Sequence, residues 1–246
     1  MRKELALIAI AHRGVFVHQT SQASASHLIG GVIRALHSRR PAVINVYTPC
    51  PVEHGLPDEW APESAKLALE SRAFPFLTYD PDAGKSIAEC LSLDGNPAVN
   101  ELWPTYTLEG VDGAGQAVKL ELPITTADWA ATESRFRKHF RDVPEEQWNE
   151  DMVAFHEFLA LPAEEREGKH PFIHTVDGNR RLRRMRVSTE MVQLAEERLL
   201  YWSQLREMAG LHVPAWVRDE IGTEMEAELE RKLAAARAEY DAKLEE

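Results

Sequence analysis

The residue of this chain best suited to chemistry is Cys50, which lies between Pro49 and Pro51. It follows residues 43–47, a β-branched and aromatic run that favours a buried strand. Because ligands of open α/β sheets bind at the carboxyl ends of strands, a thiol at this point is a candidate binding group. The alternative is a small, half-buried thiol that only packs in a tight turn.

Several short motifs accompany Cys50 over residues 48–94. They are Thr48-Pro49-Cys50, His54-Gly55, Lys66-Leu67-Ala68, Glu70-Ser71, Tyr79-Asp80-Pro81, Gly84-Lys85 and Leu93-Asp94. In this order they resemble the end of the thiamine-diphosphate-binding domain of the pyruvate:ferredoxin (flavodoxin) oxidoreductases, a 2-oxoacid:acceptor oxidoreductase family. In that family the cysteine of the Ser/Thr-Pro-Cys turn is one of four thiolates that hold the [4Fe-4S] cluster nearest the thiamine. The resemblance, closest over residues 3–94, therefore implies that Cys50 is a metal ligand.

Other motifs of the family do not occur in this sequence. The family's domain opens with a Cys-x-x-Cys pair and a Gly-Cys-Ser, followed by Gly-Asp-Gly and an Asn-rich loop that bind Mg²⁺ and thiamine diphosphate. One thiolate cannot hold a cluster, because iron–sulfur clusters need about four protein ligands. The resemblance therefore implies a fragment or a split subunit, the C-terminal part of the domain, which we expect to be inactive alone.

The resemblance also implies a reaction and its partners. The parent enzyme carries out oxidative decarboxylation of a 2-oxoacid, expected to be pyruvate, to acyl-CoA and CO₂, and passes electrons through [4Fe-4S] clusters to ferredoxin or flavodoxin. The partners would be the missing N-terminal part of the domain or other subunits, with coenzyme A and the 2-oxoacid. The alternative function is a non-catalytic assembly module derived from that domain.

Composition narrows the classes of partner and compartment. The net charge of −12 argues against nucleic acid, which needs clustered positive charge. Two cysteines in 246 residues fit a reducing compartment, so we expect a cytoplasmic protein. No apolar run approaches the ~20 residues of a membrane span, so no membrane partner is expected.

The first part of the chain, residues 1–122, predicts an α/β fold. Apolar residues 5–11 predict a strand, residues 28–36 a helix, and residues 43–47 a second strand, which together make one βαβ unit of a mostly parallel sheet. A helix from Asp58 or Pro62 to about Arg72, a strand-like run over 74–79 and a hairpin over 103–122 complete it.

Four residues fall in the loop that would follow the first strand: His12, Arg13, Gly14 and His18. They either face the thiamine or the substrate carboxylate, or are solvated or bonded to the local backbone, and both interpretations stay open. His27 and His37 are expected at the surface, and Cys90 is expected to be a free thiol.

The second part, residues 123–246, predicts an α-helical extension. One helix begins at Thr125 or Thr126, and another begins at Pro144. A third runs over 188–209 and ends at Gly210, and the last forms a long C-terminal helix. The apolar positions are Trp129, Phe136 and Phe140 in the first, Trp148, Met152, Phe155 and Leu159 in the second, and Met225, Leu229, Leu233, Ala236, Tyr240 and Leu244 in the last.

A basic cluster interrupts this acidic chain between Arg180 and Arg186. It either receives an acidic partner such as ferredoxin or the phosphates of coenzyme A, or is a solvated edge that pairs with acidic neighbours. The sequence does not choose between the two.

Overall fold

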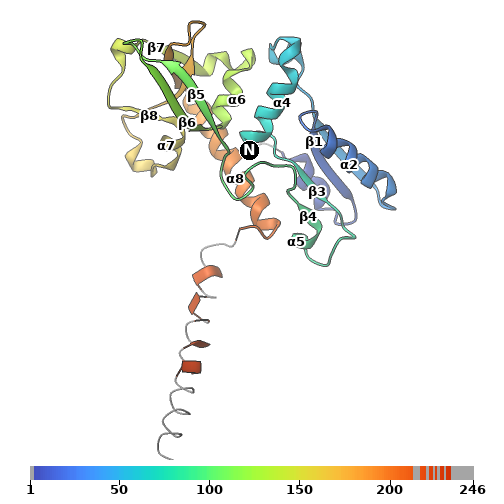
Figure 1. The fold of residues 1–246 in the computed structure, drawn as a ribbon. Helices are drawn as coiled ribbons and strands as arrows, with labels where there is room; N and C mark the ends of the chain where they lie inside the picture. Colours follow the sequence, from blue (N-terminus) through green and yellow to red (C-terminus); the bar gives the residue numbers. More distant parts are fainter. Residues whose placement is uncertain are drawn as a thin grey trace, which may run out of the picture.

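The computed structural model describes residues 3–212, 217–219, 222–223, 225, 228–229 and 231–233 (Figure 1). Two four-stranded sheets lie on either side of the long helix α8 (Thr189–Met208), which runs between them. One face of α8 supplies Tyr201, Trp202 and Leu205 to the first apolar core, and Met191, Val192 and Ala195 to the second. The fold is therefore mixed α/β, with one helix shared by both cores.

The first sheet has the order β2-β1-β3-β4. Strands β1 (Phe16–Ser21) and β2 (Ala42–Tyr47) are parallel, while β3 (Leu77–Tyr79) is antiparallel to β1 and β4 (Leu91–Ser92) is antiparallel to β3. The sheet is thus mixed rather than mostly parallel, because the chain re-enters at the carboxyl end of β1. The helices of this part are α1 (Leu5–Ile10), α2 (Ala25–His37), α3 (Pro51–His54), α4 (Ala61–Glu70) and α5 (Ile87–Cys90), with a 3-10 turn at Asp58–Trp60.

The predicted βαβ unit is present, but its first strand is not the apolar run at residues 5–11. That run forms helix α1, which buries Ala6, Ala9 and Ile10 at helical spacing. Short apolar runs fit a helix or a strand equally well, so the prediction of a strand was wrong. The strand is β1, and α2 crosses from it to β2, with Ser24 as the helix N-cap.

A hairpin and the second sheet follow along the chain. The hairpin of β5 (Thr105–Val111) and β6 (Ala117–Pro123) confirms the prediction over residues 103–122. The sheet has the order β7-β10-β9-β8, and its strands are β7 (Phe140–Val143), β8 (Met152–Ala154), β9 (His170–Val176) and β10 (Leu182–Val187). Helix α6 (Thr126–Ala131) and a 3-10 turn at Ser134–His139 precede β7. Helix α7 (Phe155–Ala160) and 3-10 turns at Glu145–Gln147 and Ala163–Glu165 connect the strands β7, β8 and β9.

The expectation of an all-helical extension was therefore wrong between residues 132 and 187. The helix that Thr125 caps ends at Ala131, and Phe140 opens strand β7. The helix expected from Pro144 does not form: only the 3-10 turn Glu145–Gln147 follows, and the Asn149 side chain then accepts the Asp151 amide hydrogen at 3.1 Å, a local turn that competes with helix. Strand β8 then pairs with β9, and only Phe155–Ala160 is helical.

Helix α8 confirms the prediction over 188–209. Ser188 caps its N-terminus, and Gly210, at φ +69°, ends it in the left-handed conformation that glycine adopts readily. Further on, Met225, Leu229 and Leu233 are helical and exposed, whereas Ala236, Tyr240 and Leu244 lie outside the described residues. The limits 1–122 and 123–246 stay a prediction. Within the described part of the chain, no helix is long and apolar enough to span a membrane.

Candidate functional site at the end of strand β2

Cys50 lies where the sequence predicts, just beyond the carboxyl end of β2, and its side chain is exposed. Its carbonyl accepts a 2.8 Å hydrogen bond from the His54 amide, which closes the single turn of α3. The Leu56 amide binds the Pro51 carbonyl at 2.9 Å and ends that turn. The thiol therefore projects to solvent from a compact, hydrogen-bonded turn, and the half-buried alternative does not describe it.

A buried carboxylate, Glu133, contacts residues on both sides of this turn. Its Oε1 accepts hydrogen bonds from the Tyr47 hydroxyl at 3.1 Å and the Ser64 hydroxyl at 2.9 Å, and lies 3.3 Å from His54 Nδ1. Its Oε2 accepts from Arg135 Nε at 2.6 Å. This one carboxylate therefore links β2, α3 and α4 to the segment after α6. These contacts fix the position of the turn that carries Cys50.

The ionisation of this cluster follows from its geometry. Burial and the nearby Glu133 charge raise the pKa of the Tyr47 hydroxyl, so it stays protonated and donates to the carboxylate. Arg135, paired with Glu133, compensates the charge that would otherwise be costly to bury.

Gly55, which follows α3, is required by two independent features. Its φ is +65°, a left-handed conformation that disfavours residues with a Cβ. A Cβ added here would also lie 2.5 Å from the Ser134 Cβ, and the Ser134 hydroxyl donates to the Gly55 carbonyl at 2.8 Å. The residues after α6 therefore contact the turn on a second side.

The described part of the chain contains no group of three or more His, Cys, Asp or Glu side chains able to hold a metal ion. The second cysteine, Cys90, is free, as predicted, and buried. It precedes β4, which pairs with Tyr79, and Tyr79 in turn pairs with Val17 at the amino end of β1. The two thiols therefore lie at opposite ends of the sheet, and Cys50 can offer only a single thiolate.

The loop residues predicted beside the first strand lie elsewhere. His12 and Arg13 are exposed and, with Gly14, precede β1 at its amino end, away from Cys50. His18 is buried within β1, where its Nδ1 lies 2.9 Å from the Thr78 hydroxyl. The structure therefore does not bring these four residues to the carboxyl edge of the sheet.

His27 is half-buried, contrary to the expectation of a surface residue, whereas His37 is exposed as predicted. The His27 ring stacks on Phe76 with centroids 4.5 Å apart, and its Nδ1 lies 2.9 Å from the Thr20 hydroxyl. Burial, followed by the charge of His18, lowers the pKa of His27 to about 4. His27 is therefore a neutral packing residue.

The arginines of the basic cluster separate in the structure. Arg180 lies 3.7 Å from Glu109, and Arg183 pairs with Asp142. The Arg184 guanidinium lies 4.4 Å from the ring centroids of both Trp148 and Phe172. The paired arginines support the interpretation as a solvated edge for part of the cluster only, since Arg186 has no carboxylate partner among the described residues.

Comparison with known proteins finds no matching family model and no matching curated protein. The family resemblance therefore rests on the sequence motifs alone.

Proposed function

We propose that this chain is part of a 2-oxoacid:ferredoxin or flavodoxin oxidoreductase of the cytoplasm, with Cys50 as one of the four ligands of a [4Fe-4S] cluster. The observation that carries this proposal is the exposed Cys50 thiol on a turn fixed by Glu133. A thiol so held is accessible to a cluster whose other three ligands come from another polypeptide segment.

The unpaired edge of strand β2, beside Cys50, supports the proposal that another polypeptide segment packs there. Among the strands that the structure describes, β2 is at the edge of its sheet, with β1 on one side only. Its residues Ile44 and Val46 are 37% and 41% exposed, and an unpaired apolar edge strand is a template for another strand or segment. We propose that the part of the enzyme supplying the remaining thiolates packs against this edge.

The residues described here fit a single-ligand role and no more. Within the described chain nothing gathers the ligands for Mg²⁺, so thiamine diphosphate and Mg²⁺ would be held by the partner. When bound, the cluster would carry single electrons away from the thiamine, and this chain would contribute one sulfur and its fixed position. The 2-oxoacid, expected to be pyruvate, coenzyme A and the electron acceptor would likewise meet the assembled enzyme.

The second candidate is a non-catalytic assembly module. It is favoured by three apolar residues on the outer face of α2, Ile29, Ile33 and Leu36, which are 56%, 49% and 79% exposed. Residues spaced by four and three along a helix form one stripe, which is typical of a surface that packs on a partner.

Co-expression separates the two functions. The chain would be produced with a polypeptide carrying the Cys-x-x-Cys, Gly-Cys-Ser and Gly-Asp-Gly motifs, and the complex analysed for iron, sulfide and the visible absorbance of a [4Fe-4S] cluster. We expect a brown complex whose absorbance Cys50→Ala abolishes and Cys90→Ala preserves. A Cys50→Ala complex with the full cluster spectrum contradicts the proposal, and a stable colourless complex favours the assembly module.

A further inference from the structure

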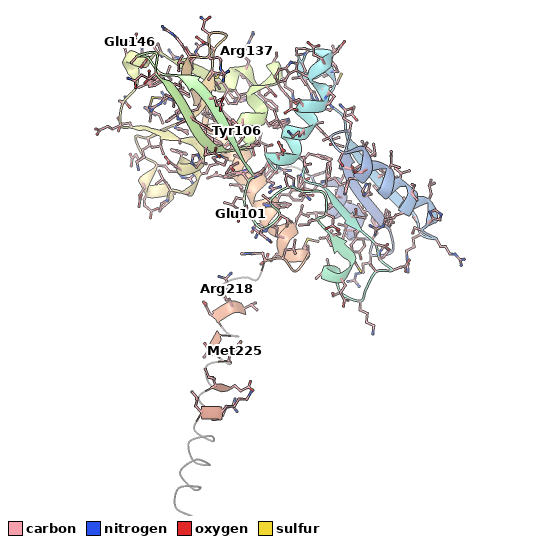
Figure 2. The ribbon with its side chains drawn as sticks, viewed as in Figure 1. Glu101, Tyr106, Arg137, Glu146, Arg218 and Met225 are labelled. Atoms are coloured by element: carbon pink, nitrogen blue, oxygen red, sulfur yellow. The ribbon has the colours of Figure 1, made fainter. Side chains whose placement is uncertain are left out.

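A cavity of about 470 Å³ opens on the outer face of the second sheet. It lies between the ends of strands β7 and β10 and the segment 144–152, which includes Glu146, labelled in Figure 2. Its polar lining residues are Arg141, Asp142, Gln147, Asn149, His170 and Arg186. Most of these side chains are hydrogen-bond donors.

Arg141 and Arg186 form a like-charged pair across two strands. They are directly opposite in the register of β7 and β10, so their side chains leave the same face of the sheet. Such opposed residues have Cβ atoms roughly 5 Å apart, and like charges at this position destabilise the sheet. Within the described chain the Arg141 side chain makes no ion pair or hydrogen bond, and the Arg186 side chain makes a single hydrogen bond, to His170, so no carboxylate compensates the positive charge of the pair.

The carboxylates nearby do not neutralise this pair. Asp142 also lines the cavity, but it is opposite Met185 in the register, and its carboxylate is already paired, since Arg183 Nε donates to it at 2.8 Å. The segment beside the cavity also carries exposed acidic residues, and in the described structure none of them forms an ion pair with Arg141 or Arg186; they are Glu145, Glu146, Glu150 and Asp151.

The other groups of the cavity also present donors. Arg186 Nη2 lies 3.0 Å from His170 Nδ1, and because an arginine can only donate, this ring nitrogen accepts and the ring hydrogen is on Nε2. Asn149 uses its Oδ1 to accept from the Asp151 amide, which leaves its NH₂ group as the free part of the side chain. Two guanidinium groups, an imidazole N–H and an amide therefore line one recess.

We propose that this cavity binds the phosphate group of a small phosphorylated molecule. A tetrahedral phosphate offers acceptor oxygens in several directions, and here donors come from β7, β10, the start of β9 and the segment 144–152. A planar carboxylate would be satisfied by one arginine fork. An acidic protein surface, which is larger than the recess, would also meet exposed carboxylates such as Glu146 and Glu150 on the segment beside it. This proposal does not depend on the oxidoreductase assignment.

Thermal unfolding of the full chain with pyrophosphate as the probe, at constant ionic strength, tests the proposal. We expect the melting temperature to rise with pyrophosphate, because a ligand of the folded state stabilises it. Arg141→Gln should weaken binding about tenfold or more. The matched control is Arg181→Gln, an exposed arginine outside the cavity lining, and it should bind as the wild type does.

A second signature separates loss of the site from loss of the fold. Without pyrophosphate, Arg141→Gln should melt no lower than the wild type, because Arg141 has no protein partner to lose and faces a like charge. Arg186→Gln, followed by ³¹P line broadening of pyrophosphate, gives an independent measurement. Equal affinity in Arg141→Gln, equal weakening in Arg181→Gln, or a larger shift with citrate than with pyrophosphate would each overturn the proposal.

Discussion

The Tyr47 hydroxyl donates a 3.1 Å hydrogen bond to Glu133, a buried carboxylate 86 residues further along the chain. Tyr47 ends the strand that leads to Cys50, and Glu133 follows helix α6. The position of the exposed thiol therefore depends on the second part of the chain as well as on the strand that precedes it.

Replacing Glu133 by Gln should destabilise the protein. The substitution removes the negative charge that faces Arg135 and keeps the size of the side chain, so a cation is left next to an uncharged, buried group. Breaking a fully buried ion pair costs about 3 kcal/mol, and because the Arg135 side chain is 35% exposed we expect a smaller fall in the free energy of unfolding, about 1–2 kcal/mol, in urea. Glu146→Gln, at an exposed position without an ion pair in the described structure, should change it by less than about 0.5 kcal/mol. A Glu133→Gln variant as stable as this control would show that the carboxylate does not hold the turn.

The two cysteines should differ sharply in their reaction with a thiol reagent under native conditions. Cys50 is exposed and should react in a fast phase, whereas Cys90 is buried with 7% of its surface exposed and should react only as the protein unfolds. Cys50→Ser should abolish the fast phase, and Cys90→Ser should preserve it. Mass spectrometry of peptides labelled with iodoacetamide measures both sites, and rapid native labelling of Cys90 would contradict the burial of that thiol.

Arg72 should be intolerant even to lysine. Its buried guanidinium donates to the carbonyls of Pro97, Ala98 and Leu102 at 2.7 to 2.9 Å. It also lies 4.2 Å from the ring of Trp202, in α8.

Because lysine cannot reproduce a planar fork that reaches three carbonyls, we expect Arg72→Lys to lower the free energy of unfolding by about 2–3 kcal/mol. The matched control is Arg137→Lys, which exchanges the same residue types in the 3-10 turn after α6, where the structure gives Arg137 no ion pair. Chemical denaturation measures both variants, and equal stability of the two would contradict the role of the guanidinium fork.

The elements that could be predicted are those whose local signals agree. Helix α8 combines the Ser188 cap, apolar residues at helical spacing and a terminal Gly210, and strand β2 is a β-branched run stopped by Pro49. Local propensity and tertiary packing favour the same structure in both cases. The position of Cys50 after a strand was predicted for this reason, while its role as a cluster ligand stays a prediction.

The elements that could not be predicted are stabilised by partners distant in the sequence. Strand β1 is fully buried although it contains His18, Gln19 and Thr20, because each polar side chain finds a hydrogen-bond partner in another segment. The hydrophobic pattern of the sequence predicts a loop for such polar residues. Glu133 is similar, since nothing in the residues around it indicates that a tyrosine, a serine, a histidine and an arginine will converge on its carboxylate.

The pH dependence of stability should include a contribution from Asp128, a partly buried carboxyl at the start of α6. Burial raises its pKa from 3.8 to about 6, although the Thr125 hydroxyl and amide donate to it. Between these two pKa values the folded protein keeps a proton that the unfolded chain has lost. The free energy of unfolding therefore falls as the pH rises from about 4 to about 6.

Asp128→Asn should remove this contribution. Two histidines act in the opposite direction: burial lowers the pKa of His27 and of His174 from 6.5 to about 4, so acid destabilises the fold through them. They are present in both proteins, so the quantity to compare is the difference in free energy of unfolding between wild type and Asp128→Asn. We expect the free energy of unfolding of the wild type, minus that of Asp128→Asn, to be about 2 kcal/mol larger at pH 4 than at pH 7.

Urea denaturation at the two pH values measures this difference. The exposed Asp151 provides the matched control, and Asp151→Asn should leave the dependence on pH as in the wild type. If Asp128→Asn also leaves the dependence unchanged, the carboxyl of Asp128 is ionised as readily in the folded protein as in the unfolded chain. Hydration at the start of α6 would then outweigh the burial that raises its pKa.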